Sequence, residues 1–99
     1  MTAPERTPDG RFIIVNGRKW RASDPVLPEE LAAALRSELG SARSRIGHTS
    51  EERERRGLRD RVQLAKEGLG ERGTAWWEME EAERIARAED RLERLRKLN

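Results

Sequence analysis

An Asn-Gly pair at positions 16 and 17 lies between two short runs of β-prone residues, and it constrains the fold more than any other feature. Both central residues of a type I′ turn need a positive φ, which asparagine and glycine tolerate best. The sequence therefore predicts a β-hairpin with a two-residue loop over about residues 11–22. In the register that this turn sets, Ile13 lies opposite Trp20.

The predicted hairpin has an apolar face and several cationic side chains. Ile13, Val15 and Trp20 share one face, which we expect to pack on a helix because an isolated hairpin is only marginally stable. A basic β-ribbon can contact the grooves or the phosphates of a nucleic acid. The alternative interpretation is that the charges solvate a sheet edge and cover Phe12. The candidate contacts to nucleic acid or to another partner are Arg11, Arg18, Lys19 and Arg21.

Two amphipathic helices are predicted after a turn at Ser23-Asp24-Pro25. The first covers about residues 28–46 and has proline at its first position. The second follows a capping-box pattern at Thr49 and Glu52 and ends at a glycine cap, Gly70. Because the connection is short, we expect an antiparallel helical hairpin. The apolar stripes are Leu31, Leu35, Leu39, Ala42 and Ile46 in the first helix, and Leu58, Val62, Ala65 and Leu69 in the second.

A third, densely charged helix is predicted over residues 78–99, with Thr74 as its N-cap. Several Glu or Asp residues precede an Arg or Lys by four positions, which stabilises a helix. The apolar stripe covers only about two heptads, fewer than are needed to identify a coiled coil. We expect this helix to project, or to form a homodimer through its apolar stripe. The stripe consists of Ile85, Ala88, Leu92 and Leu95.

Together these elements predict an α+β fold, in which a two-stranded N-terminal β-hairpin packs on an antiparallel helical hairpin and a third amphipathic helix follows. The expected organisation is a disordered tail over residues 1–9, a small domain over residues 10–77 and a charged C-terminal helix over residues 78–99. The chain has 99 residues, of which 40% are charged. A chain of this size and composition can bury only a small core.

Adjacent tryptophans at positions 76 and 77 form the second candidate site. Neighbouring residues on a helix point about 100° apart, so one indole can enter the core while the other cannot easily follow. An exposed tryptophan is a frequent anchor in protein interfaces, which makes Trp76 and Trp77 candidate protein contacts. The alternative interpretation is that both indoles close the hydrophobic core.

No residue pattern in the chain indicates catalysis. There is no cysteine, and His48 has no partner at the spacing of a zinc site or a catalytic triad. We therefore expect a protein that is not an enzyme and that has no cofactor and no metal site. The leading hypothesis is a small adaptor or regulator that binds another protein. The alternative is a nucleic-acid-binding protein that uses the basic hairpin.

The N-terminus lacks the apolar run of a signal peptide, and no segment reaches the roughly 20 apolar residues of a membrane span. The expected location is the cytoplasm, without membrane contact. The formal net charge is only +2, so a basic site has to be local.

Two motifs resemble those of a family of small bacterial proteins of about this length. One is Gly-Arg-Lys-Trp-Arg-Ala-Ser-Asp-Pro at residues 17–25, and the other is Leu-Gly-Glu-Arg-Gly at residues 69–73, followed by the two tryptophans. The resemblance covers roughly residues 8–78. It implies no defined activity, although some members carry a label that mentions a Tol-type biopolymer transporter. It also implies that the last helix is an addition found in some members.

Overall fold

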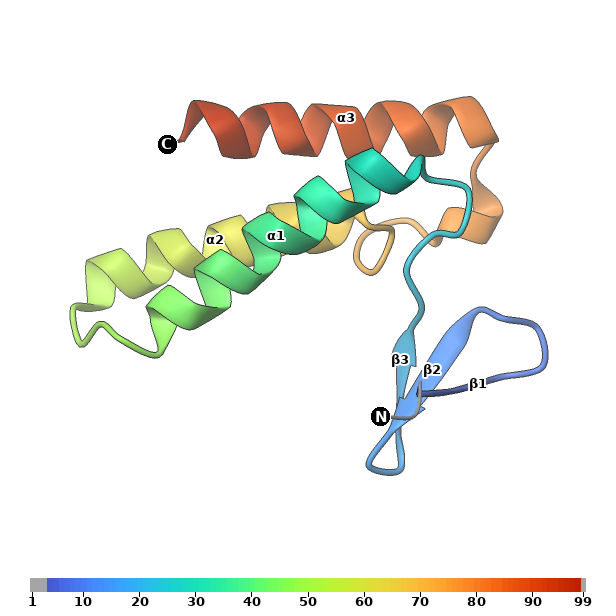
Figure 1. Cartoon of the computed structure of the whole chain (residues 1–99), viewed down its shortest axis with the longest axis horizontal. Coiled ribbons are helices and arrows are strands. Elements are labelled where there is room, and N and C mark those ends of the chain that lie inside the picture. The colour runs from blue at the N-terminus through green and yellow to red at the C-terminus, as the bar shows by residue number, and fades with distance from the viewer. Residues whose placement is uncertain (1–3, 99) are drawn as a thin grey trace.

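The computed structural model describes residues 4–98 of the chain. A three-stranded antiparallel sheet precedes three α-helices, which confirms the predicted α+β class (Figure 1). The strands are β1 (Glu5–Arg6), β2 (Phe12–Val15) and β3 (Arg18–Arg21). The helices are α1 (Glu29–Ile46), α2 (Glu52–Gly68) and α3 (Glu81–Lys97), and a short 3-10 helix, η1 (Trp76–Glu78), precedes α3.

The hairpin between β2 and β3 has the predicted register. Ile13 pairs with Trp20 and Val15 pairs with Arg18. Asn16 and Gly17 have φ angles of 53° and 78°, as the type I′ turn requires. The local turn chemistry is therefore sufficient to predict the pairing of both strands.

The prediction of a disordered tail over residues 1–9 is wrong for its second half, and residues 1–3 lie outside the described residues. β1 pairs with β2, so the sheet has three strands and not two. The connection is a turn in which the backbone N–H of Gly10 donates to the carbonyl of Thr7, and the Thr7 hydroxyl donates to Asp9. Proline, aspartate and glycine in succession are typical turn residues, a signal that the tail prediction overlooked.

The helix starts differ from the predicted ones. α1 begins at Glu29, so Pro28 is the residue before the first helical turn and not within it. Thr49 is not an N-cap. Glu51 occupies that position, and the Thr49 hydroxyl instead accepts a hydrogen bond from the Glu51 backbone N–H. At the other end of α2 the predicted glycine cap is confirmed, because Gly70 has a φ of 84°.

The predicted start of the third helix is also wrong. Thr74 does not cap a helix, since the chain forms η1 and then an extended residue, Met79, before Glu80 precedes α3. The physical reason is that the indole of Trp76 bonds to the carbonyl of Ala22 and the indole of Trp77 contacts Phe12 of β2. These two contacts turn the chain before α3 begins.

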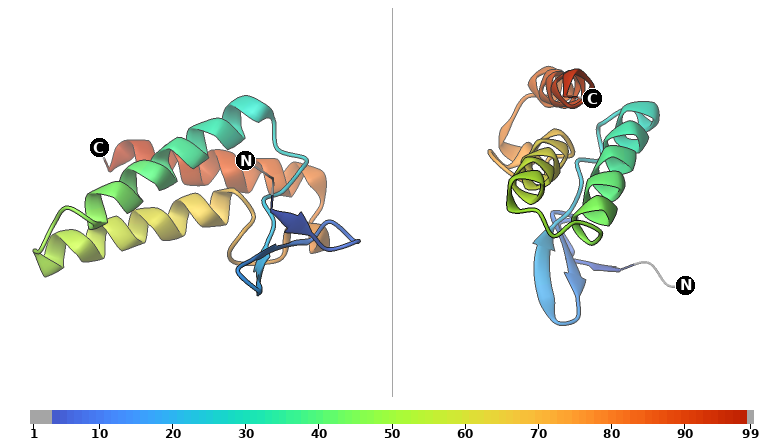
Figure 2. Two further views of the ribbon diagram at one scale, coloured as in Figure 1. Left: turned by 60° about the horizontal axis from the view of Figure 1, so that its bottom comes forward. Right: turned by 90° about the vertical axis from the view of Figure 1, so that its left-hand side faces the viewer.

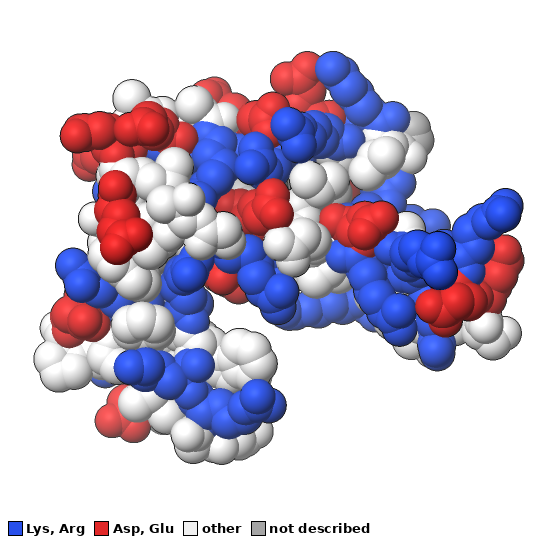
Figure 3. Space-filling view, turned by 180° about the vertical axis from the view of Figure 1, so that it is seen from behind, with Lys and Arg blue, Asp and Glu red and all other residues white. Residues whose placement is uncertain are grey.

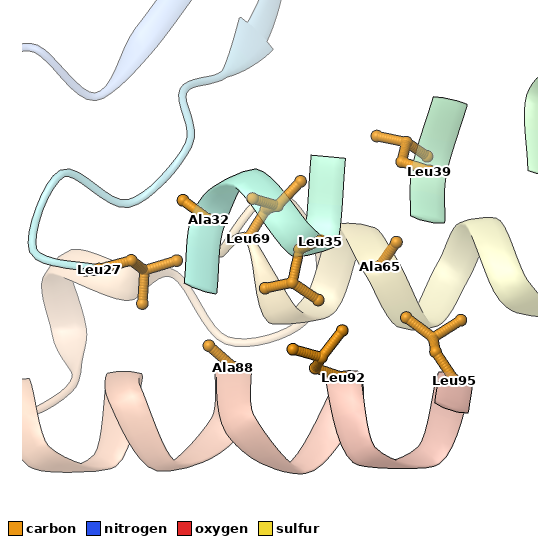
Figure 4. Packing of buried hydrophobic residues seen from close by; sticks show 9 residues of the cluster. All are labelled: Leu27, Ala32, Leu35, Leu39, Ala65, Leu69, Ala88, Leu92 and Leu95. Atoms are coloured by element: carbon orange, nitrogen blue, oxygen red, sulfur yellow. The ribbon is translucent and has the colours of Figure 1, made fainter. Parts of the chain in front are cut away.

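The three helices enclose one hydrophobic core, and α3 is an integral part of it (Figure 4). Ala88, Leu92 and Leu95 face α1 and α2 and are buried. The helix therefore does not project, and the stripe expected to form a homodimer is occupied within the chain. The buried cluster consists of Leu27, Ala32, Leu35, Leu39, Ala65, Leu69, Ala88, Leu92 and Leu95.

The sheet and α3 lie on opposite sides of the α1–α2 pair (Figures 1 and 2). The expectation that the face with Ile13, Val15 and Trp20 packs on a helix is wrong, because Trp20 is 42% exposed and Val15 is also exposed. The sheet stands off from the helices and leaves a hollow beside this face.

Candidate functional site

The sheet is attached to the helices at one joint, which the chain forms between residues 22–24 and the start of α3. The indole Nε1 of Trp76 donates to the carbonyl oxygen of Ala22 at 3.0 Å, and the backbone N–H of Asp24 donates to the carbonyl of Leu69 at 2.8 Å. Trp76 is only 8% exposed, so it belongs to the core and does not present a contact surface to a partner.

A buried ion pair reinforces this joint. The guanidinium of Arg84 donates to both carboxylate oxygens of Asp24, with a distance of 2.8 Å from Nε to Oδ2. The hydrogen bonds to Asp24 raise the pKa of Arg84. The guanidinium carbon of Arg84 also lies over the ring of Trp76, 5.1 Å from its centre. The joint therefore combines an ion pair, an aromatic contact and two hydrogen bonds to the backbone.

One face of the sheet covers an aromatic pair. The rings of Phe12 and Trp77 meet edge to face at 5.4 Å. Arg11 and Arg21 lie over the Trp77 ring at 5.0 and 5.7 Å, and Lys19 lies over Phe12 at 4.4 Å. Three of the four predicted cations thus make cation–π contacts with this aromatic pair. Trp77 is half-buried beneath them, so its indole is largely covered by side chains of the same chain.

The opposite face carries the fourth cation. Arg18 lies over the ring of Trp20 at 5.0 Å, and both residues are exposed. The structure therefore separates the predicted basic site: Arg11, Lys19 and Arg21 belong to one face of the sheet, and Arg18 belongs to the other.

A groove lies between the Trp20 face of the sheet and the α1–α2 pair. Its volume is about 430 Å³. In the space-filling view, lysine and arginine side chains border the hollow that separates the sheet from the helices (Figure 3). The residues that line the groove are Ile13, Val15, Trp20, Arg21, Ser23, Arg43, Lys66 and Glu71.

Arg43 of α1 and Lys66 of α2 form the cationic wall of the groove, and sequence reasoning missed both. Each lies in an amphipathic helix rich in charged residues, where nothing in the local pattern distinguishes it from its neighbours. Only the antiparallel packing of α1 and α2 brings these side chains to the same groove, opposite the hairpin.

Glu71 offsets the charge of the cationic wall only in part. Burial lowers the pKa of Lys66, and the charges of Arg72 and Arg43 lower it further, while Glu71 opposes them. Across residues 4–98 neither Arg43 nor Lys66 forms an ion pair. The carboxylate of Glu71 instead accepts a hydrogen bond from the Ser23 hydroxyl at 2.7 Å. The groove therefore retains an excess of positive charge.

None of the helices in residues 4–98 has the length and apolar character needed to span a membrane. Within the same residues, no three histidine or acidic side chains gather as metal ligands would. Comparisons with protein-family models, curated proteins and solved structures find no match to this chain.

Proposed function

We propose that the chain is a non-catalytic binding module that recognises a segment of another protein, as a small adaptor or regulator does. The observation that carries this proposal is the open groove beside Trp20, which combines an apolar wall with a cationic one. Binding sites for small groups are typically hollows of about 300–1,000 Å³ with mostly apolar walls and a few polar groups that give specificity. We further propose a cytoplasmic location, which suits a chain without cysteine.

A selection of displayed random peptides against the whole chain tests this function. We expect enrichment of peptides that share a short consensus and that bind the purified protein in solution. A selection that yields no peptide above the background of an uncoated surface would contradict the proposal. Because the library is random, the selection can succeed whichever protein the natural partner is.

A second candidate function is nucleic-acid binding, which the cationic hairpin favours. Arg11, Arg18, Lys19 and Arg21 all lie on or next to β2 and β3, in a sheet that stands off from the helices. Binding through them predicts an affinity for oligonucleotides that falls steeply as salt increases. The matched test is charge reversal at Arg18 and Lys19, which should abolish binding. If neither single-stranded nor double-stranded oligonucleotides bind at low salt, this candidate is excluded.

A further inference from the structure

The two walls of the groove differ in chemistry, and this difference specifies an occupant. We propose that the groove binds a partner segment in which an apolar side chain is adjacent to a carboxylate. The apolar side chain rests on Ile13, Val15 and Trp20, and the carboxylate reaches Arg43 and Lys66. This inference rests on the proposed function, and it names the site and the chemistry of the segment bound there.

The sheet supplies the apolar wall. Ile13, Val15 and Trp20 share one face because side chains alternate along a strand, and the pairing of β2 with β3 brings Trp20 beside Ile13. Among residues 4–98, three large hydrophobic residues are exposed, and Val15 and Trp20 are two of them. Covering such side chains with an apolar group is favourable at roughly 25 cal/mol per Å² of apolar surface removed from water.

The helices supply the charged wall. Arg43 and Lys66 both line the groove, and the charge of Arg43 lowers the pKa of Lys66 in addition to burial and the charge of Arg72. A carboxylate placed between them offsets these charges and accepts hydrogen bonds from two cationic donors, which are stronger than bonds between neutral groups. Glu71 offsets these charges only in part, so the cationic wall is complementary to an acidic side chain of the partner.

The groove suits an acidic protein segment better than a nucleic acid. Glu71 lines the same hollow and is held there by Ser23, so its negative charge would oppose a run of phosphates. A single carboxylate can avoid Glu71 by approaching from the side of Arg43 and Lys66.

The test measures how tightly the whole chain binds a synthetic peptide in which glutamate and leucine alternate. The peptide carries a dye, and the fluorescence anisotropy of the dye reports binding. Lys66→Glu and Trp20→Ala should each weaken binding by at least about tenfold, which corresponds to about 1.4 kcal/mol. The matched control is Arg56→Glu. Arg56 is an exposed arginine of the same helix, about 15 Å along its axis from Lys66, and its reversal should leave binding unchanged.

The other outcomes separate the site from the function. If peptides from the random selection bind the chain, but Lys66→Glu and Trp20→Ala bind them as tightly as the unaltered protein, the groove is not the site and only this inference is overturned. If no peptide binds at all, the proposed function fails with it. If a peptide that alternates lysine and leucine binds as well as the acidic one, or if oligothymidine binds in its place, the chemistry assigned to the occupant is wrong.

Discussion

The guanidinium of Arg84, in the first turn of α3, donates to both carboxylate oxygens of Asp24, at the end of the segment that leaves the sheet. The side chain of Asp24 is 1% exposed and that of Arg84 is 13% exposed. This pair joins residues that are 60 positions apart and connects the segment that follows β3 to α3. We therefore expect the position of the sheet, and with it the width of the groove, to depend on this joint.

Replacing Asp24 should therefore destabilise the fold strongly. Asp24→Ala leaves the Arg84 charge buried without its partner, and loss of one member of a buried pair typically costs about 3–5 kcal/mol. Chemical denaturation measures the free energy of unfolding. The control is Glu29→Ala, which removes the exposed ion pair of Glu29 with Arg36 and should cost less than about 1 kcal/mol. Equal effects of the two substitutions would show that the joint is not a main support of the fold.

Substituting alanine at two glycines should have opposite effects on the stability of the protein. Gly70 has a φ of 84°, and an added Cβ would lie 3.0 Å from Trp76 Cδ1 and 3.1 Å from Asp24 Cβ. Gly70→Ala should cost about 2 kcal/mol or more, because it adds backbone strain to a steric clash. Gly57 lies within α2 with open space around it, so Gly57→Ala should stabilise the protein by about 0.5–1 kcal/mol. Thermal unfolding compares them, and a stabilising Gly70→Ala would contradict the described joint.

The packing of α3 can be tested with two leucines near its C-terminal end. Leu95 is fully buried against α1 and α2, whereas Leu98 is 55% exposed. Leu95→Ala should lower the free energy of unfolding by about 2–5 kcal/mol, because it leaves a cavity in the core. Leu98→Ala should change it by less than about 0.5 kcal/mol. If Leu95→Ala were as mild as Leu98→Ala, α3 would not belong to the core in solution.

Acid should weaken the contact between α2 and α3. Burial favours the neutral form of Glu67, but hydrogen bonds from Arg91 and Gln63 outweigh it and lower the pKa of Glu67 below its ordinary value of 4.5. A lowered pKa in the folded state contributes stability above pH 4.5 that is lost as the pH falls through the folded value. Urea unfolding across this range should show a steeper loss for the unaltered protein than for Glu67→Gln. Parallel curves would contradict the ion pair with Arg91.

The parts of the fold that local chemistry determines can be predicted from the sequence. Asn16 and Gly17 fix the hairpin register, and the helical spacing of leucines such as Leu35 and Leu95 identifies core positions. The alternation of side chains in β2 and β3 also defines a face correctly. It does not say what covers that face, which is why the pattern predicts a packed Trp20 although the residue is exposed.

The candidate site depends on contacts between distant residues, which a single sequence does not reveal. The sequence leaves open whether one or both of the paired tryptophans enter the core. Trp76 does so, but the acceptor of its indole N–H is the backbone of Ala22, 54 positions away. Arg43 and Lys66 reach the groove only through the packing of α1 against α2. In the sequence, nothing distinguishes these two residues from the charged residues on the solvent-exposed face of a helix.

An NMR titration tests whether the groove is the binding site: the indole N–H signals of the three tryptophans are recorded while the glutamate–leucine peptide is added to the whole chain. Tryptophan-to-phenylalanine variants assign the signals. We predict that the signal of Trp20 shifts as the groove fills, while that of Trp76, which is buried and bonded to Ala22, stays in place. A titration in which the peptide binds while the Trp20 signal does not move would show that this groove is not the binding site.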